Sequence, residues 1–421
     1  MKLIENHETE AVNGHVPPSP TKLTLRPHPI AISGMALRVP RGLESPQDFW
    51  EFLLAKGDVS GRVPESRHSI SASYPDVLPS FDTGRFSLRR AELELADHQQ
   101  RRLLEVVRQA FDDAAEINLK LWGRLARDAK QGPETRVCES AVIGGVNLVM
   151  APRMTTFMSG KSIISQEGHC RAFPDDAKGY VSGEAVTAVF IKPLDATFRD
   201  GNPVRAVIRS VITNSDGKMQ EIAHQSTESE ETLMRKAYQD PGVSDLYQTA
   251  FVECHDTGTP VGDPIKANVV ARVFGDAGAY IGSVKPNLGH SRGASGLTSL
   301  FKAVLSLENR PIPPSIKFAK PNPKIPFKER KWTVPIEPSP WPQDHLERVS
   351  VNSFGIAGSN AHAIVDSACG FKVCGSSSTP IAGTSSLIES RPHSFTVFSD
   401  ISPVSAEDGE RVPLLEQENP E

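Results

Sequence analysis

The sequence lacks three features that would each have pointed to a class of function. No stretch of its 421 residues approaches the roughly 18 apolar residues of a membrane span, so we expect no membrane partner. There is no long basic run and the net charge is only -5, which argues against nucleic acid as a partner. The first 20 residues are polar and acidic, unlike a secretory signal. We therefore expect a cytoplasmic protein.

Cysteine is scarce and has no metal-binding arrangement. The chain has five cysteines, an odd number, at positions that match no metal-site spacing: Cys138, Cys170, Cys254, Cys369 and Cys374. We therefore expect free thiols in a reducing compartment and no metal site. Cys254 and His255 are neighbours, but adjacent residues of a strand point to opposite faces, which argues against a shared metal ion.

Polar sequence of low complexity occupies both ends of the chain. Residues 1–29 are rich in Pro, Glu, His and Asn, and residues 367–421 in Ser, Pro and Glu. Such compositions are typical of disordered segments. We predict a disordered N-terminal tail over 1–29, one folded domain over 30–366, and a C-terminal linker or tail over 367–421.

Between those ends, strand-like and helix-like segments alternate. Near-continuous apolar runs predict strands buried on both faces, at residues 29–39, 139–150, 183–194, 204–213, 247–254, 280–285, 348–354 and 361–367. Apolar residues at helical spacing predict helices at residues 45–58, 91–117, 227–240, 263–274 and 296–309. This alternation predicts an α/β fold built in layers around a central sheet.

The stretch VECHDTGTPVGDP, residues 252–264, follows one of these strands with a histidine. Four helix breakers come next: Gly258, Pro260, Gly262 and Pro264. We therefore expect His255 at the tip of a buried strand, held by a stiff turn. Such loop positions often carry binding or catalytic side chains, although a histidine there can also simply cap a turn.

A second histidine follows a lysine further along the chain. The stretch SVKPNLGHSRGASG places Lys285 after a strand, then a Pro-Asn-Leu-Gly turn, then His290. Small residues after His290 open the helix predicted over 296–309. We therefore expect His290 near a helix N-terminus, whose positive dipole favours a neutral ring.

A third stretch, NSFGIAGSNAHAIV, interrupts a strand with a glycine-rich loop. It contains Phe354, Gly355, Gly358 and Asn360, and such a loop can offer backbone N–H groups to a developing oxyanion. Two neutral histidines, a lysine and free amides suit the stabilisation of an enolate formed from a thioester. Decarboxylation of a malonyl group produces such an enolate, and carbon–carbon bond formation consumes it.

These stretches and several others resemble the ketosynthase (beta-ketoacyl synthase) domain of fungal, highly reducing type I polyketide synthases. The resemblance runs from about Ile30 to Asp366 and includes IAISGMALRVPRGLESPQDFWEFLLAKGD, FDTGRFSLRRAELELADHQQRRLLEV and GHCRAFPDDAKGYVSGEAV. It implies a thiolase-like fold, a dimer of layered α-β-α-β-α subunits. It also implies a transferase of secondary metabolite biosynthesis. Such an enzyme elongates acyl chains held on the phosphopantetheine of an acyl carrier protein and binds no cofactor directly.

The resemblance assigns catalytic roles to three residues. His255 and His290 match the family's two active-site histidines, and Lys285 matches its lysine. Asp256 stands where the first histidine motif of the family has glycine. The resemblance therefore implies that the chain keeps the groups that act on the malonyl thioester.

The resemblance also assigns substrate-binding roles. Thr257 and Thr259 match the family's contacts to the pantetheine arm, and Phe354 matches its gating phenylalanine. Ala357 stands in the glycine-rich loop where the family has glycine. These residues imply a channel for a carrier-bound substrate.

The family's nucleophile has no counterpart in this sequence. Members carry a cysteine in a Thr-Ala-Cys-Ser-Ser turn at a helix N-terminus, which lowers the thiol pKa, and that motif is absent. The family's pattern has several dozen further residues at a junction near residues 122–126, including a strand and the nucleophile turn. We therefore expect a thiolase-like fold that is incomplete and lacks a central strand–helix unit.

Four hypotheses follow for the function. In the first, the chain is a truncated ketosynthase-like protein that cannot perform condensation, because nothing holds the acyl chain. In the second, the histidine pair still decarboxylates malonyl-carrier protein without a cysteine. In the third, the chain is a non-catalytic homodimer or scaffold partner of another polyketide synthase. In the fourth, the gene model has skipped an exon, which sequencing the transcript between the codons for Trp122 and Cys138 would reveal.

Overall fold

The computed structural model describes most of the predicted domain. The described residues are 29–61, 96–115, 139–150, 155, 158–159, 163–217, 226–240, 242–243, 245–260, 262–276, 278–355 and 358–371. The junction near residues 122–126, Cys138, Cys374, and the predicted tails apart from residues 29 and 367–371 lie outside them. The bounds given above for the tails and the domain therefore stay predictions.

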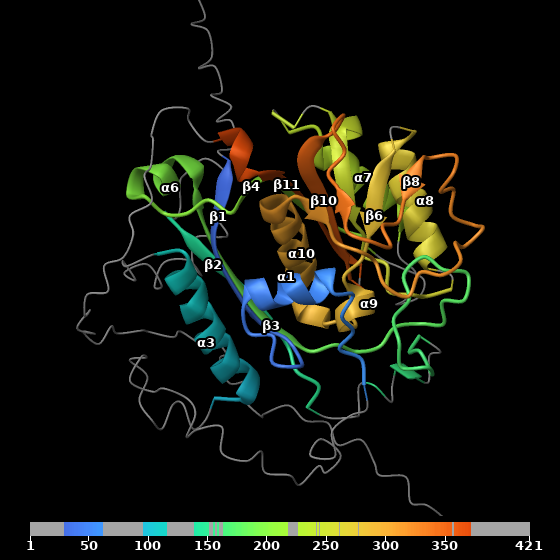
Figure 1. The fold of residues 1–421 in the computed structure, drawn as a ribbon, viewed down its shortest axis with the longest axis horizontal. Coiled ribbons are helices and arrows are strands. Elements are labelled where there is room, and N and C mark those ends of the chain that lie inside the picture. The colour runs from blue at the N-terminus through green and yellow to red at the C-terminus, as the bar shows by residue number, and fades with distance from the viewer. Residues whose placement is uncertain are drawn as a thin grey trace, which may run out of the picture.

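Nine strands form one mixed sheet in the order β2-β3-β1-β4-β11-β10-β5-β6-β8 (Figure 1). Their bounds are β1 Ile30–Arg38, β2 Ala141–Asn147, β3 Ala185–Pro193, β4 Ala206–Ser215, β5 Thr249–Glu253, β6 Ala279–Gly282, β8 Trp332–Thr333, β10 Leu346–Phe354 and β11 Ser359–Ser367. Neighbouring strands run antiparallel from β2 to β10, whereas β10, β5, β6 and β8 run parallel. Two short strands, β7 Pro311–Ile312 and β9 Ser339–Pro340, pair separately.

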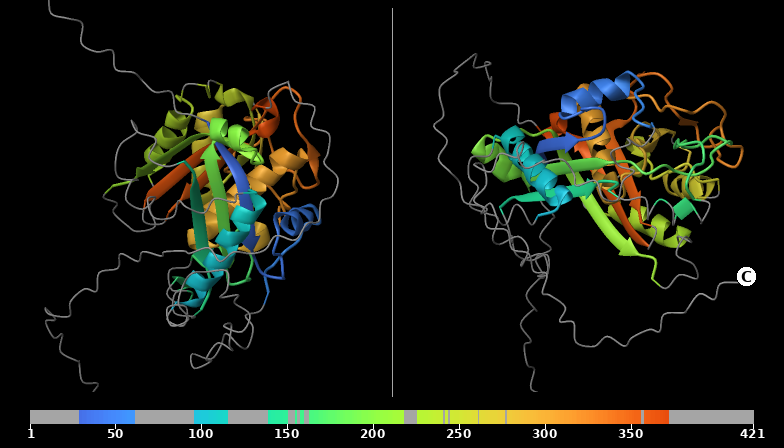
Figure 2. Two further views of the ribbon diagram at one scale, coloured as in Figure 1. Left: turned by 90° about the vertical axis from the view of Figure 1, so that its left-hand side faces the viewer. Right: turned by 90° about the horizontal axis from the view of Figure 1, so that it is seen from below.

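The helices cover the sheet on both sides and also lie between its two halves. We call β2-β3-β1 the first half and the strands from β4 to β8 in sheet order the second half. The helices are α1 Pro46–Leu54, α3 His98–Asp113, α6 Leu194–Asp200, α7 Thr227–Ala237, α8 Gly262–Phe274, α9 Lys285–Leu288 and α10 Ser295–Asn309. Helix α3 packs on the first half, α7 packs on the second, and α10 touches both. Figures 1 and 2 show α3 at one side of the molecule and α7 with α8 at the other.

Two neighbouring glycines of β2 show how the first half is covered. A side-chain carbon on Gly144 would meet Leu103 of α3 at 2.9 Å, whereas one on Gly145 would meet Gly293 and Ala294, just before α10, at 3.0 and 3.1 Å. Successive residues of a strand face opposite sides of a sheet. Helices α3 and α10 therefore cover opposite faces of the first half.

The second half is covered in the same way. On β11, Ile364 packs in the apolar cluster that contains Met234 of α7, while its neighbour Val365 packs in the cluster that contains Phe301 of α10. The layers therefore run α3, first half, α10, second half, and α7 with α8. The layered α-β-α-β-α fold predicted from the sequence is confirmed.

The first half is shorter than the second. Among the described residues, β2 pairs only with β3 and forms the edge of the sheet. In the second half, β10 is followed by β5, β6 and β8. The central strand–helix unit that the sequence predicted to be missing belongs to the junction near residues 122–126, outside the described residues, and its absence stays a prediction.

Local signals mark the starts of two helices. Ser45 caps α1, because its Oγ accepts the N–H of Asp48 at 3.1 Å and Pro46 is the first helical residue. The helix predicted over residues 263–274 begins one residue earlier, at Gly262, so the last of the four helix breakers lies inside α8. Proline fits there because N–H groups in the first turn of a helix have no helical partner.

Candidate active site

Two buried contacts of Glu253 connect the segments that carry the predicted site. Glu253 ends β5 and Lys302 lies on α10; both side chains are fully buried, and Lys302 Nζ lies 2.9 Å from Glu253 Oε2. The other carboxylate oxygen of Glu253 accepts the backbone N–H of Val284 at 2.7 Å. These contacts fix the end of β5, which leads to His255, beside the end of β6, which leads to Lys285.

One carboxylate organises the loop that follows β5. The side chain of Asp263 accepts the backbone N–H groups of Thr257, Gly258 and Thr259 at 3.0–3.3 Å. Gly258 has a φ of +88°, and a side-chain carbon there would meet Arg171 O at 2.7 Å, so the position requires glycine. The loop therefore has a defined shape, with Thr257 buried and Thr259 partly exposed. Their predicted contact with a pantetheine arm stays a prediction.

Asp256 fits this loop without backbone strain. It is not among the described non-glycine residues with positive φ, so its position does not require the glycine of the family's motif. Its carbonyl oxygen accepts a hydrogen bond from Ser283 Oγ at 3.1 Å. The substitution therefore adds a carboxyl group beside His255 without changing the course of the chain.

His290 is held by backbone contacts with the segment before β3. Its N–H donates to Val181 O at 2.7 Å, and its carbonyl accepts the N–H of Gly183 at 3.0 Å. The ring of Tyr180 packs edge-on against the His290 ring, with 5.2 Å between centroids. Gly289, with a φ of +75°, approaches Gly183 so closely that a side-chain carbon on it would lie 3.0 Å from that residue's backbone. The position of His290 is thus set by close backbone packing.

The structure brings the two predicted histidines together. The ring centroids of His255 and His290 are 5.4 Å apart, with an angle of 88° between the planes. The ring of Phe354, at the end of β10, lies 5.9 Å from that of His255. Phe354 is buried beside the histidine pair, and its gating role stays a prediction.

Both histidine rings are held in the neutral form. Burial lowers the pKa of His255 well below its usual value, and the positive charge of Lys285 lowers it further. The same two causes lower the pKa of His290 to about 3. The sequence attributed the neutral ring of His290 to the dipole of a nearby helix. A 3₁₀ turn begins at Arg292 and continues into α10 at Ser295, and burial is a further cause that the sequence did not identify.

Lys285 is buried, and its positive charge lowers the pKa of both histidine rings. Strand β6 stops at Gly282, so Lys285 begins α9 rather than ending the strand. Its side chain is 1% exposed, and its Nζ has no hydrogen-bond partner among the described residues. Burial lowers the pKa of Lys285, while the charges of Glu253 and Asp256 act in the opposite direction.

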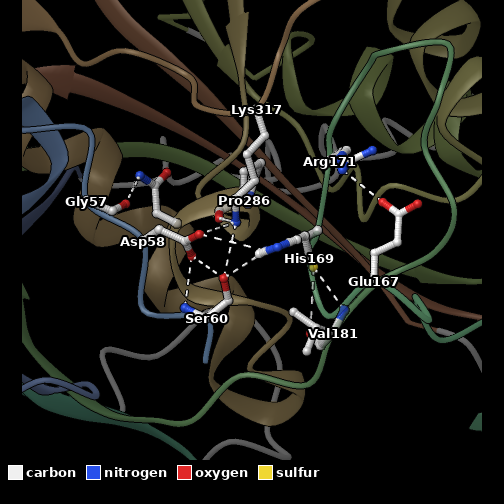
Figure 3. Close-up of polar contacts among 11 residues, drawn as sticks. Gly57, Asp58, Ser60, Glu167, His169, Arg171, Val181, Pro286 and Lys317 are labelled. Atoms are coloured by element: carbon white, nitrogen blue, oxygen red, sulfur yellow. Dashed lines mark hydrogen bonds and ion pairs between the residues drawn. The ribbon is translucent and has the colours of Figure 1, made fainter. Parts of the chain in front are cut away.

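A polar network that the sequence did not reveal holds the α9 turn. Lys317 Nζ donates to Pro286 O at 2.8 Å and lies 2.8 Å from Asp58 Oδ2. Asp58 accepts a hydrogen bond from Ser60 Oγ at 2.6 Å, and that oxygen lies 3.0 Å from His169 Nδ1. Figure 3 shows these side chains converging from separate segments of the chain. No local motif could have identified them, because the network exists only once those segments meet.

Two N–H groups of the glycine-rich loop, those of Gly355 and Gly358, are not available to an oxyanion. The N–H of Gly355 donates to Ser359 O at 2.8 Å, and the N–H of Gly358 donates to Gly355 O at 2.9 Å. Both groups are therefore used within the turn between β10 and β11. Residues 356 and 357, including Ala357, lie outside the described residues.

Neither buried cysteine is an activated nucleophile. Cys170 and Cys254 are buried, and burial raises the pKa of Cys170 to about 11 and that of Cys254 well above its usual value. A thiolate nucleophile requires a lowered pKa, so these two thiols do not replace the missing one. Cys369 is exposed in the short 3₁₀ turn Ala368–Phe371 after β11.

The described residues show neither a metal cluster nor a membrane span. No group of three or more His, Cys, Asp or Glu side chains among them could hold a metal ion. None of the helices described is long and apolar enough to cross a membrane. The arrangement is a buried cluster of two neutral imidazoles, His255 and His290, and the amine of Lys285. Such groups can donate hydrogen bonds to an oxygen that becomes negative during a reaction.

The chain matches the sequence profiles of both parts of one enzyme family. Residues 28–120 and 134–196 match the beta-ketoacyl synthase N-terminal domain, and residues 205–319 match the beta-ketoacyl synthase C-terminal domain. Residues 321–393 match the ketoacyl-synthetase C-terminal extension. The interruption of the N-terminal match, at 121–133, falls at the predicted junction.

Several fungal enzymes contain a region similar to this chain. The highly reducing polyketide synthase sphB of Aspergillus fumigatus is 46% identical over 82% of this chain and 17% of its own length. The highly reducing polyketide synthase VdtX of Byssochlamys spectabilis is 43% identical over 81% of this chain and 19% of its own length. The chain thus spans less than a fifth of these curated relatives.

Solved bacterial structures share the fold. The ketosynthase from module 6 of the bacillaene synthase of Bacillus subtilis superimposes with a TM-score of 0.71 and 27% identity, covering 80% of this chain and 72% of that one. The ketosynthase from module 1 of the bacillaene synthase of Bacillus amyloliquefaciens gives a TM-score of 0.67 at 24% identity, covering 84% and 75%. The chain therefore belongs to the beta-ketoacyl synthase family, and fungal highly reducing polyketide synthases are among its relatives.

Proposed function

We propose that this chain decarboxylates malonyl thioesters without condensing the product with an acyl chain. The observation that carries the proposal is the pair of neutral imidazoles, His255 and His290, with ring centroids 5.4 Å apart beside the buried Lys285. The substrate is a malonyl group on the phosphopantetheine arm of an acyl carrier protein. Thr257 and Thr259 contact that arm.

The chemistry uses the histidine pair to stabilise an enolate. The thioester oxygen accepts one N–H hydrogen bond from each ring. The bond between the α-carbon and the carboxylate breaks, CO₂ leaves, and the electron pair forms an enolate whose oxygen is stabilised by the two donors. The enolate carbon then takes a proton from the Lys285 ammonium group, which water reprotonates, and an acetyl thioester is released.

Condensation is excluded from the proposal because it needs a second acyl chain on a nucleophile. The Thr-Ala-Cys-Ser-Ser motif is absent from the sequence. Burial also raises the pKa of Cys170 and Cys254, which disfavours the reactive thiolate. Protonation of the enolate is therefore the end of the reaction.

Carrier protein and a second polyketide synthase are the proposed partners. The proposed reaction needs a carrier for the malonyl group and an enzyme that uses the acetyl group. The proposed assembly is a homodimer in the cytoplasm, an environment that suits the unpaired Cys170, Cys254 and Cys369.

The test measures labelled CO₂ released from malonyl-carrier protein that carries the label in its free carboxyl group. We expect release by the native chain, with acetyl-carrier protein as the only product by mass spectrometry. His255→Ala and His290→Ala are each expected to lower the rate by about 10²-fold. His345→Ala is the control, because its ring bonds Gly278 O outside the site.

Three results would contradict the proposal. Release that is unaffected by both substitutions would mean that the pair is not the catalytic group. An elongated product would mean that a nucleophile is present. A folded, dimeric native chain that releases no CO₂ would refute decarboxylation and support the non-catalytic partner function.

A further inference from the structure

A group of buried charged residues lies beneath the loop that carries His255. Asp256 is 1% exposed, and neither of its carboxyl oxygens has a hydrogen-bond partner among the described residues. Its neighbour Asp263 is also buried, but its carboxylate accepts several backbone N–H groups. Asp263 thus has a structural role in the loop, whereas the carboxyl group of Asp256 supports no part of the fold directly.

Asp256 and Lys285 are joined through one hydroxyl group. Ser283 Oγ donates to the carbonyl oxygen of Asp256 at 3.1 Å and accepts the N–H of Lys285 at 3.4 Å. The two residues therefore leave neighbouring parallel strands side by side. Lys285 Nζ, like the Asp256 carboxyl group, has no hydrogen-bond partner among the described residues.

The charges around Lys285 leave Asp256 as its available counterion. Glu253 and Asp256 favour the ammonium form, whereas burial and the positive charge of Lys266 oppose it. The other titratable groups that interact with Lys285 are Cys170, Cys254, His255 and His290, and burial favours the neutral form of each. Glu253 already forms an ion pair with a lysine of α10 at 2.9 Å. A buried ammonium group without a counterion is expected to lose its proton.

Burial and the charges around Asp256 determine the pH range in which its carboxyl group is ionised. Burial raises its pKa well above the usual value, and Asp263 and Glu230 raise it further, while Lys266 and Lys285 act in the opposite direction. The ionised fraction of Asp256 therefore grows as the pH rises. Lys285 loses its proton in the alkaline pH range, and the carboxylate form of Asp256 is present in the same range.

We propose that Asp256 is a positioning residue that acts through Lys285: its carboxylate keeps the buried lysine protonated in the histidine pocket. The inference rests on the proposed decarboxylation and says which residue keeps the proton donor, Lys285, in its charged form. The ammonium group gives one proton to the enolate carbon and recovers it from water. Without the negative charge of Asp256, Lys285 loses its proton at lower pH, and the last step of the reaction slows.

The first experiment records the pH dependence of CO₂ release for the native chain, Asp256→Asn and Asp256→Gly. We expect both substitutions to move the alkaline limb of the profile to lower pH by about one unit, the usual effect of losing a nearby opposite charge. Glu337→Gln is the control, because it removes one negative charge from an exposed side chain that pairs with Lys56 outside the site. We expect this control to leave the alkaline limb in place.

The second experiment reads the charge of Lys285 without any turnover. The side-chain nitrogen of each lysine is labelled for NMR, and the Lys285 signal is identified by its loss in Lys285→Arg. We expect the titration midpoint of this signal to fall by about one pH unit in Asp256→Asn and to stay unchanged in Glu337→Gln. An unchanged midpoint and alkaline limb in both Asp256 variants would overturn the inference. A native chain with no CO₂ release but a shifted midpoint would refute the proposed function alone.

Discussion

The two halves of the sheet follow the same plan, yet only one carries the strand ends of the site. In each half, the strand that comes first in the sequence, β1 or β4, lies at the border between the two halves. An antiparallel pair of consecutive strands, β2-β3 or β10-β11, completes a three-stranded unit in each half. Helix α3 covers the outer face of the first half as α7 covers that of the second. Only the second half extends beyond this unit among the described residues, through β5, β6 and β8.

The difference shows why the chemistry-bearing residues can stay together when the first half is short. His255, Lys285 and Phe354 follow or end β5, β6 and β10, all in the second half. From the segment before β3 of the first half, Tyr180 packs against the ring of His290 and Val181 O accepts its backbone N–H. Substitutions that destabilise each half separately therefore test which half the site depends on.

The largest effect is expected from breaking the ion pair inside the second half. Glu253→Gln keeps an acceptor for the Val284 N–H but leaves Lys302 buried without a counterion. We expect the free energy of unfolding to fall by about 3–5 kcal/mol, measured by urea denaturation. Adding Lys302→Met is expected to restore much of that loss, because no unpaired charge remains. Lys56→Ala, which removes an exposed pair with Glu337, is the control and is expected to cost below about 1 kcal/mol.

A pH-dependent effect is expected from the helix that covers the second half. Burial raises the pKa of Glu230 on α7 to about 7 from 4.5, which corresponds to about 3 kcal/mol. The folded state holds this proton more tightly than the unfolded chain. The native protein therefore loses stability as the pH rises from about 4.5 through 7. Glu230→Gln removes that loss, so we expect it to be more stable than the native chain at pH above about 7 and similar to it below pH 4.5. An equal difference at all pH values would contradict this account.

A smaller effect is expected from separating α3 from the first half. A side-chain carbon on Gly34 of β1 would lie 2.0 Å from Ala110 O of α3. We expect Gly34→Ala to destabilise the protein by about 1–3 kcal/mol through overpacking. The measurement is hydrogen exchange, with faster exchange in α3 than in α7. Gly61→Ala, at an open position, is the control and is expected to stay within about 0.5 kcal/mol. Equal loss of protection in α3 and α7 would mean that the halves unfold as one unit.

The sequence predicted the strands and the turn that carry the site residues. Apolar runs predicted β5 and β10, and His255 and Phe354 lie close together because these strands are parallel neighbours, whose carboxyl ends meet at one edge of the sheet. The motif at residues 283–290 placed Lys285 and His290 on one tight turn. The contacts that hold this turn, from Lys317 and from the segment before β3, come from distant parts of the chain and were not predicted.

The sequence could not predict features that depend on which segments meet. The pairing of Glu253 with Lys302 joins a strand to a helix far along the chain, and no pattern in either segment marks it. The N–H groups of Gly355 and Gly358 were expected to be free, but the chain turns back on itself there and uses both. Burial lowers the pKa of His290 and was not among the causes that the sequence suggested, because burial is a property of the whole fold.

The carboxylate of Asp263 has a consequence for how substrate binds. It holds the loop from Thr257 to Thr259 by hydrogen bonds to three successive backbone N–H groups. The conformational entropy of that loop is therefore lost when the chain folds, not when a ligand arrives. A ligand that contacts the loop meets a surface already in its bound shape, so more of its interaction energy appears as affinity.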